Sequence, residues 1–94
     1  MTAIIATLVS SNIETLSKIC KNHLSRQLFL EEGCTTCDMF VSGNVIKLIE
    51  QWKTEEDYGI HEDSEHLKLF KTLIEPLIES IHIEKFSTVY NFKE

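Results

Sequence analysis

Ninety-four residues are enough for one domain, and residues 1–94 are expected to form a single folding unit with a thin core of its own. The net charge is −6, with lysines and arginines scattered among acids, which argues against nucleic acid and anionic membrane surfaces as partners. No apolar run approaches the ~20 residues that a membrane span needs.

The first predicted element is a strand over residues 3–9, where isoleucines and a valine form an almost continuous apolar run. Both faces of this strand are apolar, so it needs cover on two sides. Residues 10–12 (Ser-Ser-Asn) are N-cap candidates for a helix over about residues 12–31, which ends near Gly33. Apolar residues at helical spacing form its buried face: Ile13, Leu16, Ile19, Cys20, Leu24 and Leu28.

A hairpin is predicted next. Residues 34–41 and 45–52 are strand candidates, and Ser-Gly-Asn at 42–44 is a tight-turn signal between them. Thr54, with Asp57 three residues later, resembles a capping box and predicts a short helix over about residues 54–62.

The last two elements are a helix and a strand. Ser64 is an N-cap candidate for a helix over about residues 65–79, in which Pro76 is expected to introduce a kink or end the regular part. Residues 81–92 are rich in β-branched and aromatic side chains and predict the final strand.

This order of elements is that of a split βαβ, ferredoxin-like α+β fold. It predicts one four-stranded antiparallel sheet with helices on one face. The other face carries apolar residues, and we expect it to be buried against the sheet of a second copy across a twofold axis.

Several spaced motifs in this framework resemble the antibiotic biosynthesis monooxygenase (ABM) domain family of the dimeric α+β barrel superfamily. The strongest part is Glu50-x-Trp52-x-Thr54, followed by His61, Ser64-x-His66 and Phe70. The opening strand Ile4-Ile5-Ala6-Thr7-Leu8 and the joint Glu32-Gly33-Cys34 add to the similarity, which runs over nearly the whole chain.

The resemblance implies a homodimer with a pocket between each sheet and its helices. It implies the oxidation of a small electron-rich aromatic, such as a quinol or anthrone, by molecular oxygen without flavin, metal or haem. The substrate supplies the electrons, while the protein removes a phenolic proton and holds the anion in a dry pocket.

Other functions remain open on the same fold. A non-catalytic dimeric module that binds a small ligand is one alternative, and a carbonyl isomerase or lyase is another. Haem-degrading relatives rely on an asparagine in the first strand and a histidine late in the last helix. Both are missing here, because the first asparagine is Asn12 and no histidine lies between His66 and His82.

Tyr58, His61 and His66 are the expected catalytic residues. Some family monooxygenases place a pocket tyrosine at this offset from the tryptophan, but a tyrosine with an ordinary pKa of about 10 donates hydrogen bonds better than it accepts protons. The two histidines are candidates because histidine is the side-chain type that changes charge near neutral pH without a large perturbation. Their spacing is not the i, i+4 of a metal-binding helix. Structural packing is the competing interpretation for all three.

Trp52, Glu50 and Phe70 are the expected substrate-binding residues. Trp52 forms either a pocket wall or a core aromatic whose indole N–H finds one partner. Glu50 lies on the same strand face as Trp52, where it orients a histidine or forms a salt bridge at the dimer seam.

The three cysteines predict free thiols. Cys34 and Cys37 spell CxxC, but residues i and i+3 of a regular strand point to opposite faces, so neither a disulfide nor zinc binding is expected. At least one cysteine cannot pair internally, and no signal peptide is evident, which together predict a reducing cytoplasm. No metal and no cofactor are expected.

Overall fold

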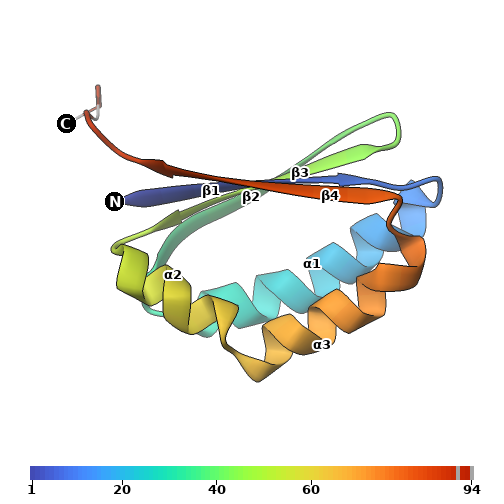
Figure 1. Ribbon diagram of the computed structural model, residues 1–94, viewed down its shortest axis with the longest axis horizontal. Coiled ribbons are helices and arrows are strands. Elements are labelled where there is room, and N and C mark those ends of the chain that lie inside the picture. Colours follow the sequence, from blue (N-terminus) through green and yellow to red (C-terminus); the bar gives the residue numbers. More distant parts are fainter. Residues whose placement is uncertain (91, 94) are drawn as a thin grey trace.

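The computed structural model describes the backbone of residues 1–90, 92 and 93, and their side chains except those of residues 25–29. The elements follow in this order: β1 (Thr2–Val9), α1 (Ile13–Leu30), β2 (Cys34–Ser42), β3 (Val45–Trp52), α2 (Glu55–Glu62), α3 (Glu65–Ile74), the 3₁₀ turn η1 (Glu75–Leu77) and β4 (Ser80–Ser87). All helices lie on one face of a single sheet (Figure 1). The predicted ferredoxin-like α+β fold is confirmed.

The sheet has the strand order β2-β3-β1-β4, and every neighbouring pair is antiparallel. β1 is central and pairs over its full length with both β3 and β4. The turn between β2 and β3 contains Gly43 at φ 57°, a left-handed conformation that glycine adopts without steric cost. The predicted hairpin of β2 and β3 therefore forms, and β3 pairs with β1, the first strand of the chain.

The core lies between the sheet and the helices. Alternate residues of β1 are buried against the helical layer, where Ile4 and Leu8 are 2% and 1% exposed. Burying a side chain of this kind contributes about 1.5–3 kcal/mol. The buried cluster consists of Ile4, Ala6, Leu8, Leu16, Cys20, Leu24, Ile46, Leu48, Trp52, Tyr58, Phe70 and Ile74.

The ends of the helices follow local signals. The hydroxyl of Thr54 accepts a hydrogen bond from the Asp57 backbone N–H at 3.0 Å, and that of Ser64 accepts one from the Leu67 N–H at 3.3 Å. α3 ends at Ile74 and continues as the 3₁₀ turn that contains Pro76. The two predicted caps and the predicted effect of the proline are confirmed.

Gly33 has a packing role beyond the end of α1. A Cβ atom at this position would lie 2.3 Å from the Cβ of Asp57, so α2 can pack against this joint only because no side chain is present. The Gly33 carbonyl also accepts a hydrogen bond from the Lys53 N–H at 2.8 Å. The joint therefore sets the position of α2 relative to β3. Leu28, which was expected on the buried face of α1, lies outside the described side chains.

The final strand is shorter than expected, since it ends at Ser87 rather than at Phe92. β4 lies at an edge of the sheet and pairs only with β1, which begins at Thr2 opposite Ser87. One further hydrogen bond joins the Thr88 N–H to the Met1 carbonyl at 2.8 Å. Among the described residues after Thr88, none has a neighbouring strand to pair with, so their strand propensity does not extend β4.

The expectation for the two CxxC cysteines was wrong about their direction. The register between β2 and β3 shifts between Cys34 and Thr36, so that Cys34 lies opposite Trp52 and Cys37 opposite Glu50. Trp52 and Glu50 share the helix-facing side of β3, so both cysteines lie on that side as well. All three cysteines are free thiols.

The face of the sheet opposite the helices has no second layer in the described part of the chain (Figure 1). Phe40 and Phe86 lie on this face and are 57% and 49% exposed. Burial of this face in a dimer stays a prediction. None of the helices within the described residues combines the length and apolar character needed to cross a membrane.

Candidate active site

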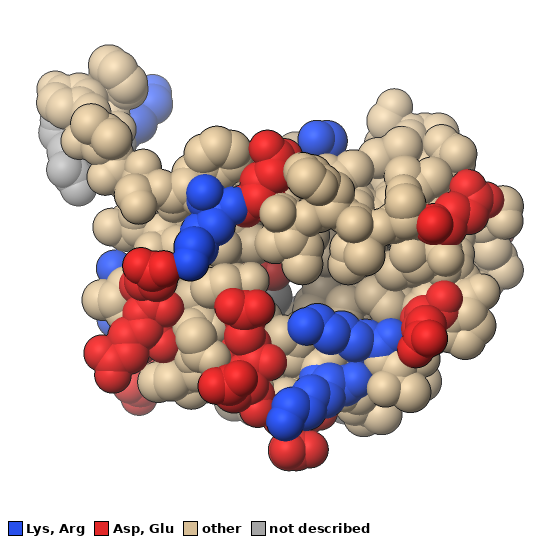
Figure 2. Space-filling view, in the orientation of Figure 1, with Lys and Arg blue, Asp and Glu red and all other residues tan. Residues whose placement is uncertain are grey.

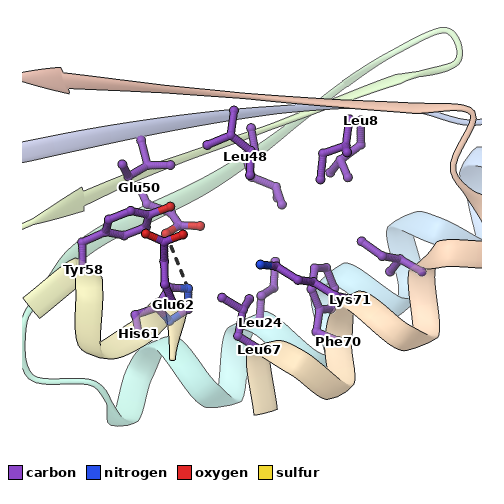
Figure 3. A pocket seen from close by; sticks show the side chains of 15 residues that line it. Leu8, Leu24, Leu48, Glu50, Tyr58, His61, Glu62, Leu67, Phe70 and Lys71 are labelled. Carbon is purple, nitrogen blue, oxygen red and sulfur yellow. Dashed lines mark ion pairs between the residues drawn. The ribbon is translucent and has the colours of Figure 1, made fainter. Parts of the chain in front are cut away.

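A chamber of about 60 Å³ lies between the sheet and the helical layer, towards β4 (Figure 3). Its walls are mostly apolar side chains of β1, β3, β4, α1 and α3. Its polar lining comes from five side chains, namely Glu50, Tyr58, His61, Glu62 and Lys71. Three of these residues, Glu50, Tyr58 and His61, are themselves buried. The chamber is therefore an apolar space with its reactive groups concentrated on α2 and the end of β3.

His61 is held on several sides. It lies in the last turn of α2 and is 3% exposed, and its ring is 4.7 Å from the Trp52 ring, centroid to centroid. Nδ1 lies 2.6 Å from Oε2 of Glu31, just beyond the end of α1. A carboxylate can only accept a hydrogen bond, so Nδ1 carries the proton and is the hydrogen-bond donor to Glu31. The other nitrogen, Nε2, faces Glu50 at 4.0 Å.

Glu50 is a buried carboxyl, 7% exposed, at the polar end of the chamber. Its Oε1 accepts a hydrogen bond from Nε1 of Trp52 at 3.0 Å. Burial raises the pKa of Glu50, while the nearby His61 and the Trp52 hydrogen bond lower it, and burial prevails. Glu50 is therefore easier to protonate than an exposed glutamate.

Tyr58 is poorly suited to act as a base. Burial is the main cause that raises the pKa of its phenol to about 12, and the charges of Glu62 and Glu50 and a hydrogen bond with Glu62 add to the effect. The phenol is therefore protonated at neutral pH and can act as a hydrogen-bond donor. Its ring lies 5.9 Å from the Trp52 ring and 6.1 Å from the His61 ring.

His66 stands outside the chamber, but the same carboxylate connects it to His61. Its Nε2 lies 3.6 Å from Oε1 of Glu31 and has no hydrogen-bond partner among the described residues. Glu31 thus lies between the two histidines that the sequence singled out. Nowhere in the described part of the chain do three or more His, Cys, Asp or Glu side chains form a group that could hold a metal ion.

The structure places some of the expected catalytic and substrate-binding residues at the chamber and others away from it. Tyr58, His61, Glu50 and Phe70 line the chamber. Trp52 is 1% exposed and packs behind His61, and it borders a separate surface pocket of about 230 Å³ next to Gly33. Its indole N–H has the single partner that a core tryptophan requires, while the ring also supports the histidine.

Sequence reasoning missed Glu31, Glu62 and Lys71. Glu31 directly precedes the Glu32-Gly33-Cys34 joint, so an acid at that point was a usable signal. Glu62 is on the same helix as Tyr58, four residues further on. Lys71 follows Phe70 on α3, and its ammonium group points into the cavity (Figure 3). Acidic side chains gather on the surface over α2 (Figure 2).

No protein-family model and no curated protein matches this chain. Several solved structures, however, are similar to this chain. A candidate antibiotic biosynthesis monooxygenase from Nitrosomonas europaea superposes with a TM-score of 0.85 at 18% identity, covering 96% of this chain and 100% of its own. One from Deinococcus radiodurans gives a TM-score of 0.89 at 14% identity, with 98% and 96% covered.

The chain has the ABM fold. The resemblance read from the spaced motifs is thus confirmed at the level of the fold. A Bacteroides thetaiotaomicron protein of unknown function, described as a candidate oxidoreductase, is 26% identical with a TM-score of 0.78 and coverages of 93% and 95%. Reaction and substrate do not follow from these similarities.

Proposed function

We propose that this protein is a cofactor-independent monooxygenase that oxidises a small electron-rich aromatic, of the quinol or anthrone kind, with molecular oxygen. The observation that supports this most is the buried pair of His61 and Glu50 at the polar end of an apolar chamber. A proton acceptor in such a place can ionise a phenolic substrate where water does not compete.

In the proposed reaction, Nε2 of His61 removes the phenolic proton. The negative charge of Glu31 against Nδ1 stabilises the imidazolium that forms. When substrate binds, the Tyr58 phenol exchanges its hydrogen bond with Glu62 for one to the developing anion, since its raised pKa keeps it a donor. Dioxygen then accepts electrons from the substrate anion. For an anthrone, one oxygen atom becomes the new carbonyl oxygen and the other leaves as water with two substrate hydrogens.

The assembly is part of the proposal. We infer that a second copy covers the open face of the sheet, which exposes Phe40 and Phe86. Sedimentation that shows a stable monomer at micromolar concentration would contradict this. The free thiols fit the reducing cytoplasm that we propose as the compartment.

Oxygen uptake with a panel of quinols and anthrones tests the reaction. His61→Ala should reduce the rate by at least about a hundredfold, because general base catalysis contributes about 10²–10⁴-fold. Tyr58→Phe should reduce it by about tenfold and leave the pH profile in place. Ile60→Ala is a matched control on the same helix, because its side chain is 65% exposed. Unchanged rates in both site variants would remove these residues from the mechanism.

The pair of His61 and Glu50 also favours one alternative, a carbonyl isomerase, because proton transfer next to a carbonyl needs the same groups. Such an enzyme would exchange substrate protons with deuterated water while consuming no oxygen. A ligand that is retained without either reaction would instead support a binding module.

A further inference from the structure

Two spaces of different size meet at Lys71. The inner chamber measures about 60 Å³, and an outer groove of about 490 Å³ runs between α3–η1 and β4. Four residues line both spaces: Lys71, Ile74, Ile81 and Ile83. A cavity needs about 10–15 Å³ to hold one water molecule. The inner chamber therefore has room for a hydroxyl group or dioxygen, and the body of a ligand must lie in the outer groove.

The outer groove has apolar walls because the helices leave β4 uncovered. Ile81 and Ile83 face the helical side of the sheet, yet they are 49% and 48% exposed. Ile74 of α3 lines the opposite wall and is 2% exposed. Facing aliphatic walls of this kind suit a flat hydrocarbon ring.

The charge at the junction of the two spaces is positive. The Lys71 side chain reaches from α3 into the cavity (Figure 3). Among the described residues, Lys68 is paired with Glu65 and Lys85 with Glu55, whereas no carboxylate lies within ion-pair distance of Lys71. Lys71 is an exposed residue, and its ammonium group beside these apolar walls is free to form a charge-assisted hydrogen bond with an anionic partner.

Carboxylates line both of the spaces that meet at the Lys71 ammonium group. Glu62 lines the inner chamber, and Glu75 and Glu79 line the outer groove. They would repel a second negative charge on a ligand, so the groove favours a monoanion over a phosphate ester.

We propose that Lys71 recognises a carboxylate, and that the substrate is an aromatic monocarboxylic acid. Its ring lies in the outer groove and its hydroxyl reaches the inner chamber towards Glu50 and His61. Only the fate of that hydroxyl rests on the proposed function, because recognition of the carboxylate does not require turnover.

Calorimetric titration with three probes tests this inference: 1-hydroxy-2-naphthoate, the neutral 1-naphthol and the dianionic 1-naphthyl phosphate. The naphthoate should bind about tenfold more tightly than either of the others, a value between those of an exposed ion pair and a buried charge-assisted hydrogen bond. Lys71→Gln should abolish this preference and Lys71→Arg should retain most of it. Lys68→Gln, on the same helix, is the matched control and should leave it unchanged.

Several results would overturn the inference. These are equal affinities for the acid and the neutral probe in the unmodified protein, a preference that survives in Lys71→Gln, an equal loss in Lys68→Gln, or no binding of any probe at millimolar concentration. Thermal unfolding of each variant verifies that it is folded. Selective binding of the acid without oxygen uptake would contradict the proposed oxygenation and leave carboxylate recognition standing.

Discussion

Replacing Trp52 by Phe tests the hydrogen bond on which the buried carboxyl depends. The indole Nε1 donates to Oε1 of Glu50 at 3.0 Å, and the two residues are 1% and 7% exposed. A hydrogen bond to a charged group contributes about 1.5–3 kcal/mol, and one between neutral groups about 0.5–1.5 kcal/mol. We therefore expect the free energy of unfolding to fall by about 1.5–3 kcal/mol from this bond where Glu50 is ionised, in addition to the cost of the smaller ring.

The pH dependence gives this prediction its sign. Burial raises the pKa of Glu50 in the folded protein above the unfolded value near 4.5, so ionisation of Glu50 disfavours folding. That penalty is absent below the unfolded pKa and complete above the folded pKa. The Trp52 hydrogen bond opposes the penalty, so Trp52→Phe should destabilise the protein more at pH 8 than at pH 4.5.

A double-mutant cycle with Glu50→Leu, which removes the acceptor, isolates the effect. Urea unfolding followed by circular dichroism gives the coupling energy between the two positions at both pH values. We expect about 1.5–3 kcal/mol at pH 8 and about 1 kcal/mol at pH 4.5. Because Glu31 and His61 lie near the same carboxyl, the Glu50→Leu background serves as the control for their contribution. A coupling energy that does not change with pH would refute the reasoning.

Three further predictions follow from local geometry. The buried imidazole N–H of His61 that donates to Glu31 should give a far-downfield signal in proton NMR. This signal should move upfield or exchange away in Glu31→Gln and persist in Glu32→Gln. Persistence in both variants would contradict the assigned hydrogen bond. Gly33→Ala would place a Cβ 2.3 Å from an α2 side chain and should cost about 1–3 kcal/mol in urea unfolding, whereas Gly59→Ala, in open space, should stabilise by about 0.4–1 kcal/mol. Burial raises the pKa of all three cysteine thiols from 9.0 to about 11 or 12, so alkylation by iodoacetamide at pH 7.5 should be at least about a hundredfold slower in the folded protein than in urea, and equal rates would contradict their burial.

Much of the fold follows from short-range signals in the chain. Thr54 and Ser64 cap the helices that they were expected to cap, because a cap needs only the next three residues. Pro76 ends the regular helix because the missing N–H and the ring act on the preceding turn. The hairpin at Gly43 is equally local. The resemblance to the ABM family needed only residue types and their spacing.

The candidate site was readable from the sequence only in part. Tyr58 and His61 were expected on α2 and do lie at the chamber. They share this helix, and its position is set by the end of β3 and by the N-cap. Glu31 was not expected there, because a separation of thirty residues carries no periodic signal and only the packing of α2 against the Gly33 joint brings it to the imidazole.

Residue identity and spacing determined the order of the elements, the caps, the turn and the family resemblance, since each depends on neighbours a few residues away. Tertiary structure alone decided three features. The register shift in β2 turns Cys34 and Cys37 to one face, and the start of β1 ends β4 at Ser87. The gap between α3 and β4 gives Lys71 a cavity to point into. The physical reason is the same in each case, because pairing register and side-chain direction are set by which distant segments meet.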